Sequence, residues 1–385
     1  SGLKEGEKMS GQEEMPEREK SLSWKNMRVL IVAGGTGGHI FPAAVFGRWL
    51  EAEQGATVSY LCGSRPLEQD IYTSMGLKPH CLSLVGSPAG TRSFWKRLRR
   101  SFDVLASVFE TRAVLREEAP DVCFLFGGYV SFAPLLLCRM KKIPLLLHEQ
   151  NSVAGRVTRL ASRLGVTIAS GWKECSGVEG FIPVGIPVRP VERVERGDAM
   201  KRLGLDLPQE ARVVGVIGGS LSSQPLMDEV IKIAGLFQDL FFVFLGAPPG
   251  DFEQGVGKKL GKWLSEKLCF LGRRWDVNAF YSLCDFLVCR SGASTLAEAM
   301  AWNIPALTVP WRGATDGHQE RNARNFEALT GNRVWDEGVD PSGRALEKLL
   351  HQPNPPLKPD FGQNACAAIW HEALKLEALK KTGKR

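Results

Sequence analysis

The sequence has no apolar run that approaches the roughly 18 residues needed to span a bilayer, so it predicts no transmembrane helix. Its first residues are polar and carry both charges, which is not the pattern of a signal peptide, and we expect none. Nine cysteines are scattered along the chain without a Cys-x-x-Cys pair, as is typical of reduced thiols in a cytoplasmic protein.

The totals favour a soluble globular protein of two domains. The chain has 385 residues, of which 44% are hydrophobic and 24% are charged. Its net charge of +7 is compatible with a nucleic acid, an anionic membrane surface or a phosphorylated substrate. We expect no nucleic-acid partner, because no recognised motif is present and the positive charge is concentrated in one short segment. Residues 1–26 are charged and Glu-rich, which predicts a disordered arm.

Beyond the arm, short apolar runs alternate with glycine-rich or polar loops and helical segments. The pattern predicts an α/β protein of two Rossmann-like domains that face each other across a cleft, with ligands bound at the carboxyl ends of the strands. We expect an acceptor-side domain at residues 27–188, a second domain at 189–352, and a proline-rich link with a C-terminal helix at 353–385. Residues 183–190 contain three prolines and look like a linker.

The first glycine loop, Gly34-Gly-Thr-Gly-Gly-His39, follows a strand expected at residues 28–33. It is not the dinucleotide fingerprint, whose third glycine would stand at Ile40, and no Gly-Lys-Ser/Thr follows as in a P-loop. A nicotinamide- or ATP-dependent enzyme is therefore disfavoured, and we expect no cofactor. The following helix is expected from about residue 43, with Pro42 in its first turn.

A second loop, residues 290–294, joins a strand expected at 286–289 to a helix expected at 295–302. The free N–H groups of such a helix point at the crevice above the sheet, where a diphosphate would sit. Glu298, about one turn into the helix, could reach a pair of sugar hydroxyls. Alternatively, Thr295-x-x-Glu298 is a capping box, in which Glu298 only ties down the helix start.

Two further stretches allow more than one interpretation. Residues 148–151, His-Glu-Gln-Asn, directly follow a buried strand, where polar groups are costly unless they bond to a ligand or cap the next helix. Residues 94–102 carry apolar side chains at helical spacing (Phe94, Trp95, Leu98 and Phe102) beside four basic ones. Such a helix can lie in a membrane interface, or it can pack its apolar face on its own domain.

Taken together and in order, the loops resemble the MurG family of bacterial peptidoglycan N-acetylglucosaminyltransferases over about residues 27–381. The matching segments are Gly34–Pro42, Gly127–Ser131, His148–Asn151, Gly218–Ser220, Arg290–Thr295 with Glu298, and His318-Gln319 with Asn322-Ala323. The resemblance implies the glycosyltransferase B fold, with the last helix packed back on the first domain. It also implies inverting transfer of N-acetylglucosamine from UDP-N-acetylglucosamine to the 4-hydroxyl of undecaprenyl-diphosphate-N-acetylmuramoyl-pentapeptide (lipid I), which gives lipid II for peptidoglycan synthesis.

The resemblance also implies roles for individual residues. Glu298 would bind the ribose diol, and the uracil would lie near residues 270–273. The diphosphate would be held by Ser220, Ala293, Ser294 and Thr295, with Arg189 and Arg290 nearby. Gln319, His318 and Asn151 would bind the sugar. Thr36, Gly37 and Gly38 would also lie on the donor side, and Gly127, Gly128, Tyr129 and Glu149 on the acceptor side.

His39 is the candidate catalytic base, because imidazole can accept a proton near neutral pH. The alternative is a loop histidine that caps the helix at Pro42. We expect no essential metal, since no Asp-x-Asp stands near the donor loops and helix N-termini with arginines can hold the leaving diphosphate. The lipid acceptor favours docking of the 94–102 segment on the anionic cytoplasmic face of the plasma membrane.

The sequence departs from the family in two loops. Residues 218–223 lack the Gln-Gly-Ala that commonly follows Gly-Gly-Ser, and Ile186 stands where Asn or Ser is usual. Three other functions stay open: a UDP-sugar epimerase, a transferase with another lipid acceptor, and a UDP-sugar sensor without catalysis.

Overall fold

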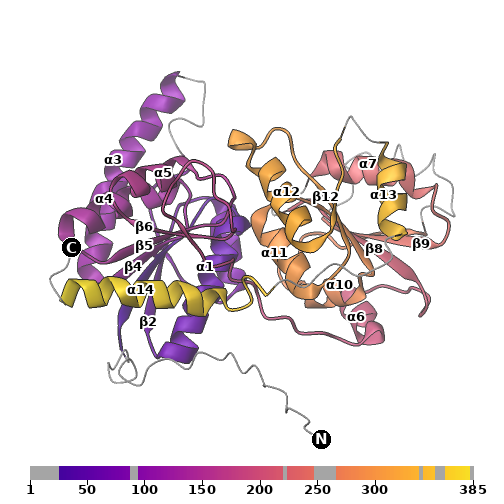
Figure 1. The fold of residues 1–385 in the computed structure, drawn as a ribbon, viewed down its shortest axis with the longest axis horizontal. Helices are drawn as coiled ribbons and strands as arrows, with labels where there is room; N and C mark the ends of the chain where they lie inside the picture. Colours follow the sequence, from indigo (N-terminus) through magenta and orange to yellow (C-terminus); the bar gives the residue numbers. More distant parts are fainter. Residues whose placement is uncertain are drawn as a thin grey trace, which may run out of the picture.

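The computed structural model describes residues 26–86, 94–219, 223–246, 266–337, 341–351 and 360–381. Nearly all of the arm predicted for residues 1–26 lies outside these ranges. The described chain forms two parallel sheets, each flanked by helices, in two halves that lie side by side (Figure 1). This arrangement confirms the predicted α/β class with two Rossmann-like units.

The first sheet has the strand order β3-β2-β1-β4-β5-β6-β7, and every neighbouring pair is parallel. Its strands are β1 (Arg28–Val32), β2 (Thr57–Cys62), β3 (His80–Cys81), β4 (Val122–Leu125), β5 (Leu145–Glu149), β6 (Thr167–Ser170) and β7 (Ile182–Pro183). The order reverses between β1 and β4, where the loops that follow the two strands diverge and open a crevice.

Alternate residues of these strands point to opposite faces of the sheet, and each face is covered by its own helices. Val29, Ile31 and Phe124 pack on one face with α1 (Gly37–Trp49), α2 (Pro66–Ser74) and α14 (Ala365–Lys381). Leu30 and Val32 pack on the other face with α3 (Phe94–Glu117), α4 (Phe132–Lys141) and α5 (Arg156–Arg163). Short π and 3-10 turns at Leu50–Gln54 and Tyr129–Ser131 extend α1 and precede α4.

The second sheet repeats the plan with the order β10-β9-β8-β11-β12-β13, again all parallel. Its strands are β8 (Arg212–Ile217), β9 (Leu240–Leu245), β10 (Leu268–Phe270), β11 (Phe286–Arg290), β12 (Ala306–Val309) and β13 (Arg333–Val334). One face packs with α6 (Arg196–Leu203), α10 (Asn278–Leu283), α11 (Ala293–Trp302) and α12 (His318–Thr330), and the other with α7 (Gln224–Ala234) and α13 (Ser342–Leu350). A 3-10 turn, Thr315–Gly317, precedes α12. The reversal in this sheet lies between β8 and β11.

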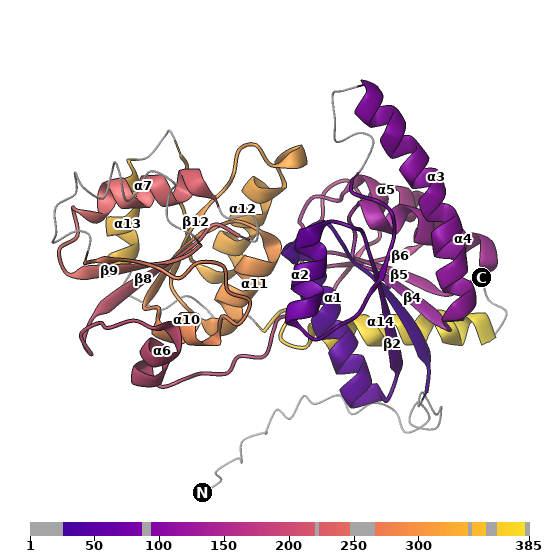
Figure 2. The same ribbon diagram turned by 180° about the vertical axis from the view of Figure 1, so that it is seen from behind.

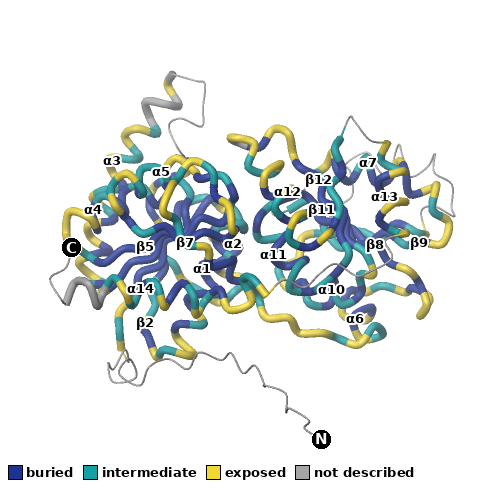
Figure 3. Tube along the Cα trace, in the orientation of Figure 1, coloured by how far each residue is buried: buried dark blue, intermediate teal, exposed yellow. Residues whose placement is uncertain are grey.

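The strands are buried almost throughout, as parallel strands covered on both faces must be (Figure 3). Full burial of an aromatic or aliphatic side chain such as Phe124 or Leu30 contributes roughly 1.5–3 kcal/mol. The two sheets therefore form rigid platforms from which the loops at their carboxyl ends project.

The C-terminal helix α14 returns to the first half, as predicted (Figures 1 and 2). Its Trp370 ring lies 6.4 Å from that of Phe124 in the first sheet. The segment before α14 touches residues 183–190, the proline-rich crossing between the halves. A Cβ on Gly185 would lie only 2.3 Å from the Cα of Gly362. With φ at +86°, Gly185 also has a backbone conformation that favours glycine.

Two helices begin earlier than the sequence predicted. The expected start of the first near residue 43 is wrong: α1 begins at Gly37, so Pro42 is inside the helix and the second half of the glycine loop is its first turn. The helix expected from Thr295 begins at Ala293, with Gly292 as its N-cap. Loop glycines and small residues adopt helical dihedrals when tertiary packing favours them, which a local pattern does not reveal.

The helix α3 covers more of the chain than the 94–102 segment that was singled out, and its beginning projects from the first half (Figures 1 and 2). Within the described residues, no helix combines the length and apolarity required to span a membrane.

Candidate active site

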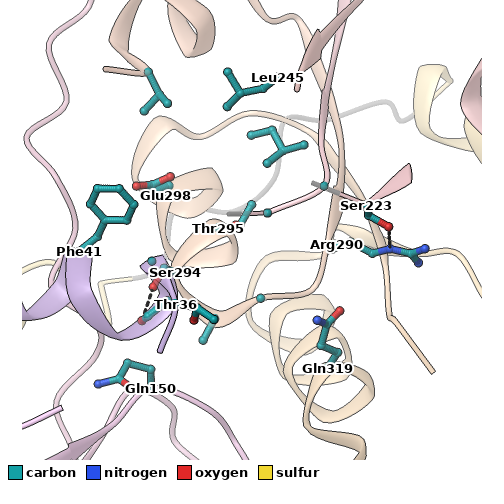
Figure 4. Close-up of a pocket in the computed structure, with 18 of the residues that line it drawn as sticks. Thr36, Phe41, Gln150, Ser223, Leu245, Arg290, Ser294, Thr295, Glu298 and Gln319 are labelled. Atoms are coloured by element: carbon teal, nitrogen blue, oxygen red, sulfur yellow. Dashed lines mark hydrogen bonds between the residues drawn. The ribbon is translucent and has the colours of Figure 1, made fainter. Parts of the chain in front are cut away.

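A cavity of about 600 Å³ lies where the carboxyl ends of the two sheets face each other (Figure 4). The first half contributes the start of α1 and the loop after β5. The second half contributes the loops after β8, β10 and β11 and the start of α12. This volume is within the roughly 300–1,000 Å³ typical of small-molecule sites.

Most residues predicted to bind the donor line this cavity: Thr36, Gly37, Gly38, Asn151, Arg189, Arg290, Ala293, Ser294, Thr295, Glu298, His318 and Gln319. The predicted base His39 lines it as well. Ser220 lies outside the described residues. The four acceptor-side residues are not in the lining, and two of them, Gly127 and Gly128, pack against the His39 ring. The binding roles of all these residues stay predictions.

Two helix N-termini converge on the cavity, those of α1 and α11. Neither has an acidic residue in its first turn, and neither has a side chain that caps its free N–H groups. Four backbone N–H groups at each such end lack a helical partner, and the helix dipole adds positive potential there. The arrangement suits an anion held between the halves of the chain.

A hydrogen bond joins the two helices directly. The Ser294 hydroxyl of α11 donates to the Gly38 carbonyl of α1 at 2.9 Å (Figure 4). That carbonyl would normally accept from the N–H four residues later, but this residue is Pro42, which has none. The proline inside α1 therefore leaves an acceptor that the second half of the chain uses.

Glu298 is paired in this structure, and it does not cap its helix. Its carboxylate accepts from Arg189 at 2.6 and 2.7 Å and from the Tyr281 hydroxyl at 2.8 Å. Because α11 begins at Ala293, Glu298 lies beyond the capping position, and the capping-box interpretation is wrong. Burial raises the pKa of Tyr281 well above its usual range, with a further contribution from Glu298, so its hydroxyl keeps the proton that it donates.

Arg189 makes contacts with both halves of the chain. Besides Glu298, it donates to the Trp275 carbonyl at 2.5 Å, and its guanidinium lies 4.3 Å from the ring centre of Phe41 in α1. It lies in the proline-rich crossing, close to the cavity and next to the first-half helix. This position allows it to exchange Glu298 for an anionic ligand.

Arg290, the other predicted arginine, has a buried side chain with several partners. It forms an ion pair with Glu337 at 2.8 Å and donates to the Ser223 hydroxyl at 3.0 Å and to the Val309 carbonyl at 3.2 Å (Figure 4). Through Ser223 it holds the end of the loop that begins at Gly218. Its observed contacts thus shape the side of the cavity that is formed by the loops after β8 and β11.

Asn151 lies in a buried contact between the halves. The Asn322 side chain accepts from the Ser152 N–H at 2.9 Å and from its hydroxyl at 2.8 Å. Its amide group donates to the Asn151 side chain and to the Ser291 carbonyl, both at 3.1 Å. Asn322 therefore joins the loop after β5 to the loop after β11, and the notable Asn322-Ala323 pair in the sequence has a structural role here.

His318 and Gln319 begin α12 at one end of the cavity. The Gln319 side-chain oxygen accepts from the Trp311 N–H at 3.0 Å. Trp311 lines the cavity with 52% of its surface exposed, which leaves an aromatic face beside these polar groups.

His39 is the third residue of α1, so the alternative that it is a loop histidine capping a helix at Pro42 is wrong. Its Nδ1 lies 2.6 Å from the Gln150 side-chain oxygen. His39 is the imidazole that the first half contributes to the lining of the cavity.

Glu149 and Tyr129, predicted on the acceptor side, have internal partners. Glu149 is buried and accepts from the Asn151 N–H and the Gly155 N–H, both at 3.0 Å, and from Thr158 in α5. It thereby orders the loop before α5, as the capping alternative for residues 148–151 proposed. The Tyr129 hydroxyl donates to the buried Glu68, and burial raises its pKa above its usual range.

Sequence reasoning missed several cavity-lining residues, among them Phe41, Gln150, Trp275, Tyr281 and Trp311. Gln150 belongs to the polar stretch 148–151 that drew attention, but no role was assigned to it. Phe41 lies within the matching segment Gly34–Pro42, again without an assigned role. The other three aromatic residues belong to no short motif, and only their proximity in the fold identifies them. Arg273, at the edge of the segment predicted near the uracil, does line the cavity. The described residues contain no group of three or more His, Cys, Asp and Glu side chains arranged to hold a metal ion.

The α3 surface has a row of exposed apolar side chains. Trp95, Phe102, Leu105 and Phe109 are 76%, 64%, 56% and 67% exposed. The alternative in which Trp95 and Phe102 pack on their own domain is therefore wrong. The side chains of Phe94 and Leu98 lie outside the described part of the structure.

Comparisons with known proteins identify the family of the chain. Residues 29–169 match the glycosyltransferase family 28 N-terminal domain, and residues 213–365 match the C-terminal domain of the same family. The UDP-N-acetylglucosamine–N-acetylmuramyl-(pentapeptide) pyrophosphoryl-undecaprenol N-acetylglucosamine transferase of Ectopseudomonas mendocina is 33% identical over 310 residues, which cover 77% of this chain and 81% of that protein.

Solved structures share the fold at lower identity. Acinetobacter baumannii MurG superposes with a TM-score of 0.63 and 22% identity, covering 91% of this chain and 99% of that one. The UDP-GlcNAc 2-epimerase of Neisseria meningitidis gives a TM-score of 0.60 at 15% identity, covering 91% and 100%. On the strength of the family 28 domains and the curated relatives, the chain belongs to the MurG family of N-acetylglucosaminyltransferases within glycosyltransferase family 28.

Proposed function

We propose that this protein transfers N-acetylglucosamine, with inversion, from UDP-N-acetylglucosamine to the 4-hydroxyl of the N-acetylmuramoyl sugar of lipid I, giving lipid II and UDP. The observation that carries the proposal is the pair of helix N-termini, of α1 and α11, that face one cavity beside the Glu298 carboxylate. A sugar nucleotide presents a diphosphate, which suits helix N-termini, and a ribose diol, which suits a carboxylate.

The donor would bind mainly to the second half. The diphosphate accepts from the free N–H groups at the start of α11 and from the Thr295 hydroxyl, and the Ser294 hydroxyl would join them by leaving the Gly38 carbonyl. The ribose diol donates to Glu298, which releases Arg189 toward the departing phosphate. Gln319, His318 and Asn151 contact the sugar hydroxyls from the far side of the cavity. Positive dipoles and guanidinium groups then stabilise the charge that develops on UDP.

The acceptor would enter from the first half, and His39 would remove the proton of its 4-hydroxyl as that oxygen attacks the anomeric carbon. General-base assistance of this kind contributes roughly 10²–10⁴-fold in rate. The backbone turn at Gly127 and Gly128 flanks the His39 ring, which supports a position for the acceptor next to this turn. Glu149 supports the reaction by ordering the loop that carries Gln150 and Asn151.

The lipid acceptor resides in a membrane, and α3 is the surface that we propose docks there, on the cytoplasmic face of the plasma membrane. Its exposed apolar side chains lie on a helix whose first turns also carry Lys96, Arg97, Arg99 and Arg100. Apolar insertion combined with attraction to anionic lipids is the usual basis of interfacial binding. No nucleic-acid partner and no cofactor form part of the proposal.

A second candidate is UDP-sugar epimerisation, favoured by the fold shared with the Neisseria meningitidis UDP-GlcNAc 2-epimerase. An epimerase needs no acceptor and no membrane contact. This function would therefore leave the exposed apolar surface of α3 without an explanation.

Product analysis separates these functions. The purified full chain is incubated with UDP-N-acetylglucosamine, with and without lipid I in anionic vesicles, and the products are separated by chromatography and weighed by mass spectrometry. We expect lipid II and stoichiometric UDP only when lipid I is present. UDP-N-acetylmannosamine, or free N-acetylmannosamine with an equal amount of UDP, formed without lipid I would establish the epimerase instead, and donor binding without any product would establish a sensor.

A further inference from the structure

Three side chains from two parts of the first half, the start of α1 and the end of β5 with the loop after it, form a continuous row of hydrogen bonds that leads away from the cavity. His39 Nδ1 lies 2.6 Å from the Gln150 side-chain oxygen, and the Gln150 amide nitrogen lies 2.9 Å from Nδ1 of His148. His148 Nε2 in turn lies 2.7 Å from the backbone carbonyl of Gly185. Of the four ring nitrogens of the two histidines, three thus have a partner in this row of hydrogen bonds. The fourth, Nε2 of His39, is not part of the row.

The donors and acceptors in this row of hydrogen bonds can be assigned in only one way, because its last group, a carbonyl oxygen, cannot donate. A backbone carbonyl accepts, so Nε2 of His148 carries a proton toward Gly185. His148 is fully buried, and this burial lowers its pKa to about 4, so the ring is neutral at physiological pH and its Nδ1 is an acceptor.

The orientation of the Gln150 amide follows from two acceptors. Its nitrogen end lies next to His148 Nδ1 and also 3.0 Å from the His148 carbonyl oxygen. Only the NH₂ end can satisfy both, so the oxygen end faces His39. A carbonyl oxygen next to Nδ1 of His39 requires a proton on that nitrogen.

We propose that Gln150, oriented by His148, is a positioning residue that holds His39 in the tautomer with its proton on Nδ1 and its lone pair on Nε2. The proposal rests on the function proposed above, in which His39 is the base. As the acceptor O–H bond breaks, the oxygen forms its bond to the anomeric carbon and the proton passes to Nε2 of His39. The bond from the anomeric carbon to the phosphate oxygen breaks, and UDP leaves with the electron pair. The imidazolium keeps its Nδ1–H bond to Gln150 and returns the new proton to solvent.

The turn formed by Gly127 and Gly128 after β4 also holds the His39 ring in place. A Cβ on Gly127 would lie 3.4 Å from Cε1 and 3.5 Å from Nδ1 of His39, and a Cβ on Gly128 would lie 3.6 Å from its Cδ2. Both glycines have a backbone φ of +79°, which residues with a Cβ rarely adopt. The backbone can therefore pack against the imidazole and hold Nδ1 on Gln150.

The tautomer can be measured without substrate. Protein labelled with ¹⁵N in its histidines is examined by two-bond ¹H–¹⁵N correlation, which distinguishes protonated from unprotonated ring nitrogens, and His39→Gln identifies the His39 signals. We expect the neutral rings of His39 and His148 to be protonated on Nδ1 and Nε2, respectively. A His39 ring protonated on Nε2 in the wild-type protein would overturn the proposal, whether or not the transferase activity is found.

Kinetics test whether the tautomer matters. Gln150→Leu should mix the two His39 tautomers and leave the imidazolium without a partner for its Nδ1–H, so kcat should fall roughly 10-fold to 10²-fold, while the KM for UDP-N-acetylglucosamine changes less than about twofold. Adding Gln150→Leu to His39→Gln should cost little more, since both changes remove one function. A full additional loss in the double variant, or an unchanged His39 spectrum in Gln150→Leu, would show that Gln150 acts by another route. Unchanged thermal unfolding and UDP binding serve as the folding controls.

Discussion

Replacement of Glu298 by Gln tests the central contact of the donor site. The carboxylate now accepts from Arg189 and from the Tyr281 hydroxyl, and its side chain is only 10% exposed. The amide oxygen of Gln can still accept from Tyr281, but the charge that pairs with Arg189 is gone. Breaking a fully buried ion pair costs about 3–5 kcal/mol, and Arg189 is 23% exposed, so we expect a loss of stability at or below the lower end of that range, roughly 2–3 kcal/mol.

Donor affinity should fall separately from stability. A carboxylate that accepts from two ribose hydroxyls makes charged hydrogen bonds worth roughly 1.5–3 kcal/mol each. Part of this gain is offset, because Arg189 must leave the carboxylate first. A net loss of about 2–3 kcal/mol corresponds to roughly a 30-fold to 150-fold higher Kd for UDP-N-acetylglucosamine.

Isothermal titration with UDP-N-acetylglucosamine measures the affinity, and urea unfolding of the ligand-free protein measures the stability. Tyr281→Phe is the matched control, because it removes one donor to Glu298 and leaves the ion pair with Arg189. It should cost about 1 kcal/mol of stability and leave most of the donor affinity. A destabilised Glu298→Gln variant with an unchanged Kd would refute the reasoning and reduce Glu298 to a structural partner of Arg189 and Tyr281.

Other predictions concern the membrane surface, the buried histidine and the glycine turn. Replacement of both Trp95 and Phe102 by Ser should release the protein from anionic vesicles in flotation assays. Donor binding should not change, because both side chains are exposed. Burial lowers the pKa of His148 from 6.5 to about 4, so this residue's contribution to stability is complete above about pH 6.5 and is lost as the pH falls toward 4. The two pKa values give a loss of roughly 2 kcal/mol in the free energy of unfolding at pH 5 relative to pH 7. In His148→Gln, the free energy of unfolding measured in urea should not show this part of the acid dependence. Gly127→Ala should cost about 1–2 kcal/mol of backbone strain and should lower kcat, since its Cβ would meet the imidazole of the proposed base.

Matched controls distinguish these effects from general damage. Leu236→Ser changes a side chain that is 70% exposed in the second half, and it should leave vesicle binding intact. Gly76→Ala introduces similar strain at φ of +67° with no atom within 4 Å of the new Cβ, so it should lower stability without lowering kcat. Vesicle binding that persists in the Trp95 and Phe102 variant would assign the membrane surface to another face. Equal kcat losses in the two glycine variants would contradict a specific contact with the base.

Much of the fold could be predicted from the chain alone. The apolar runs at 28–33 and 286–289 are strands within one residue of the expected ends, because parallel strands covered on both faces need continuous apolar sequence. Short elements such as β7 and β13 were missed, since two residues carry no periodicity. Helix starts were misjudged at Gly37 and Ala293, where small residues allow either loop or helix.

Within the site, the residue types were predicted better than their contacts. Arg189 and Glu298 were both selected, yet their pairing across 109 residues was not expected. Asn322 drew attention only as part of a motif, although its side chain joins the two halves. Such contacts depend on which loops the strand order brings together, and a local pattern contains no such information.

By itself, the sequence determined the two α/β units, the glycine turns at the ends of their strands and the family resemblance, because these depend on local residue pattern. Only the tertiary structure decided that the Gly38 carbonyl, freed by Pro42, accepts from Ser294, and that Gln150 orients His39. The partners in these two bonds are 256 and 111 residues apart. They meet because each sheet directs its loops into the same cleft, and hydrogen-bond direction then follows from which groups can donate.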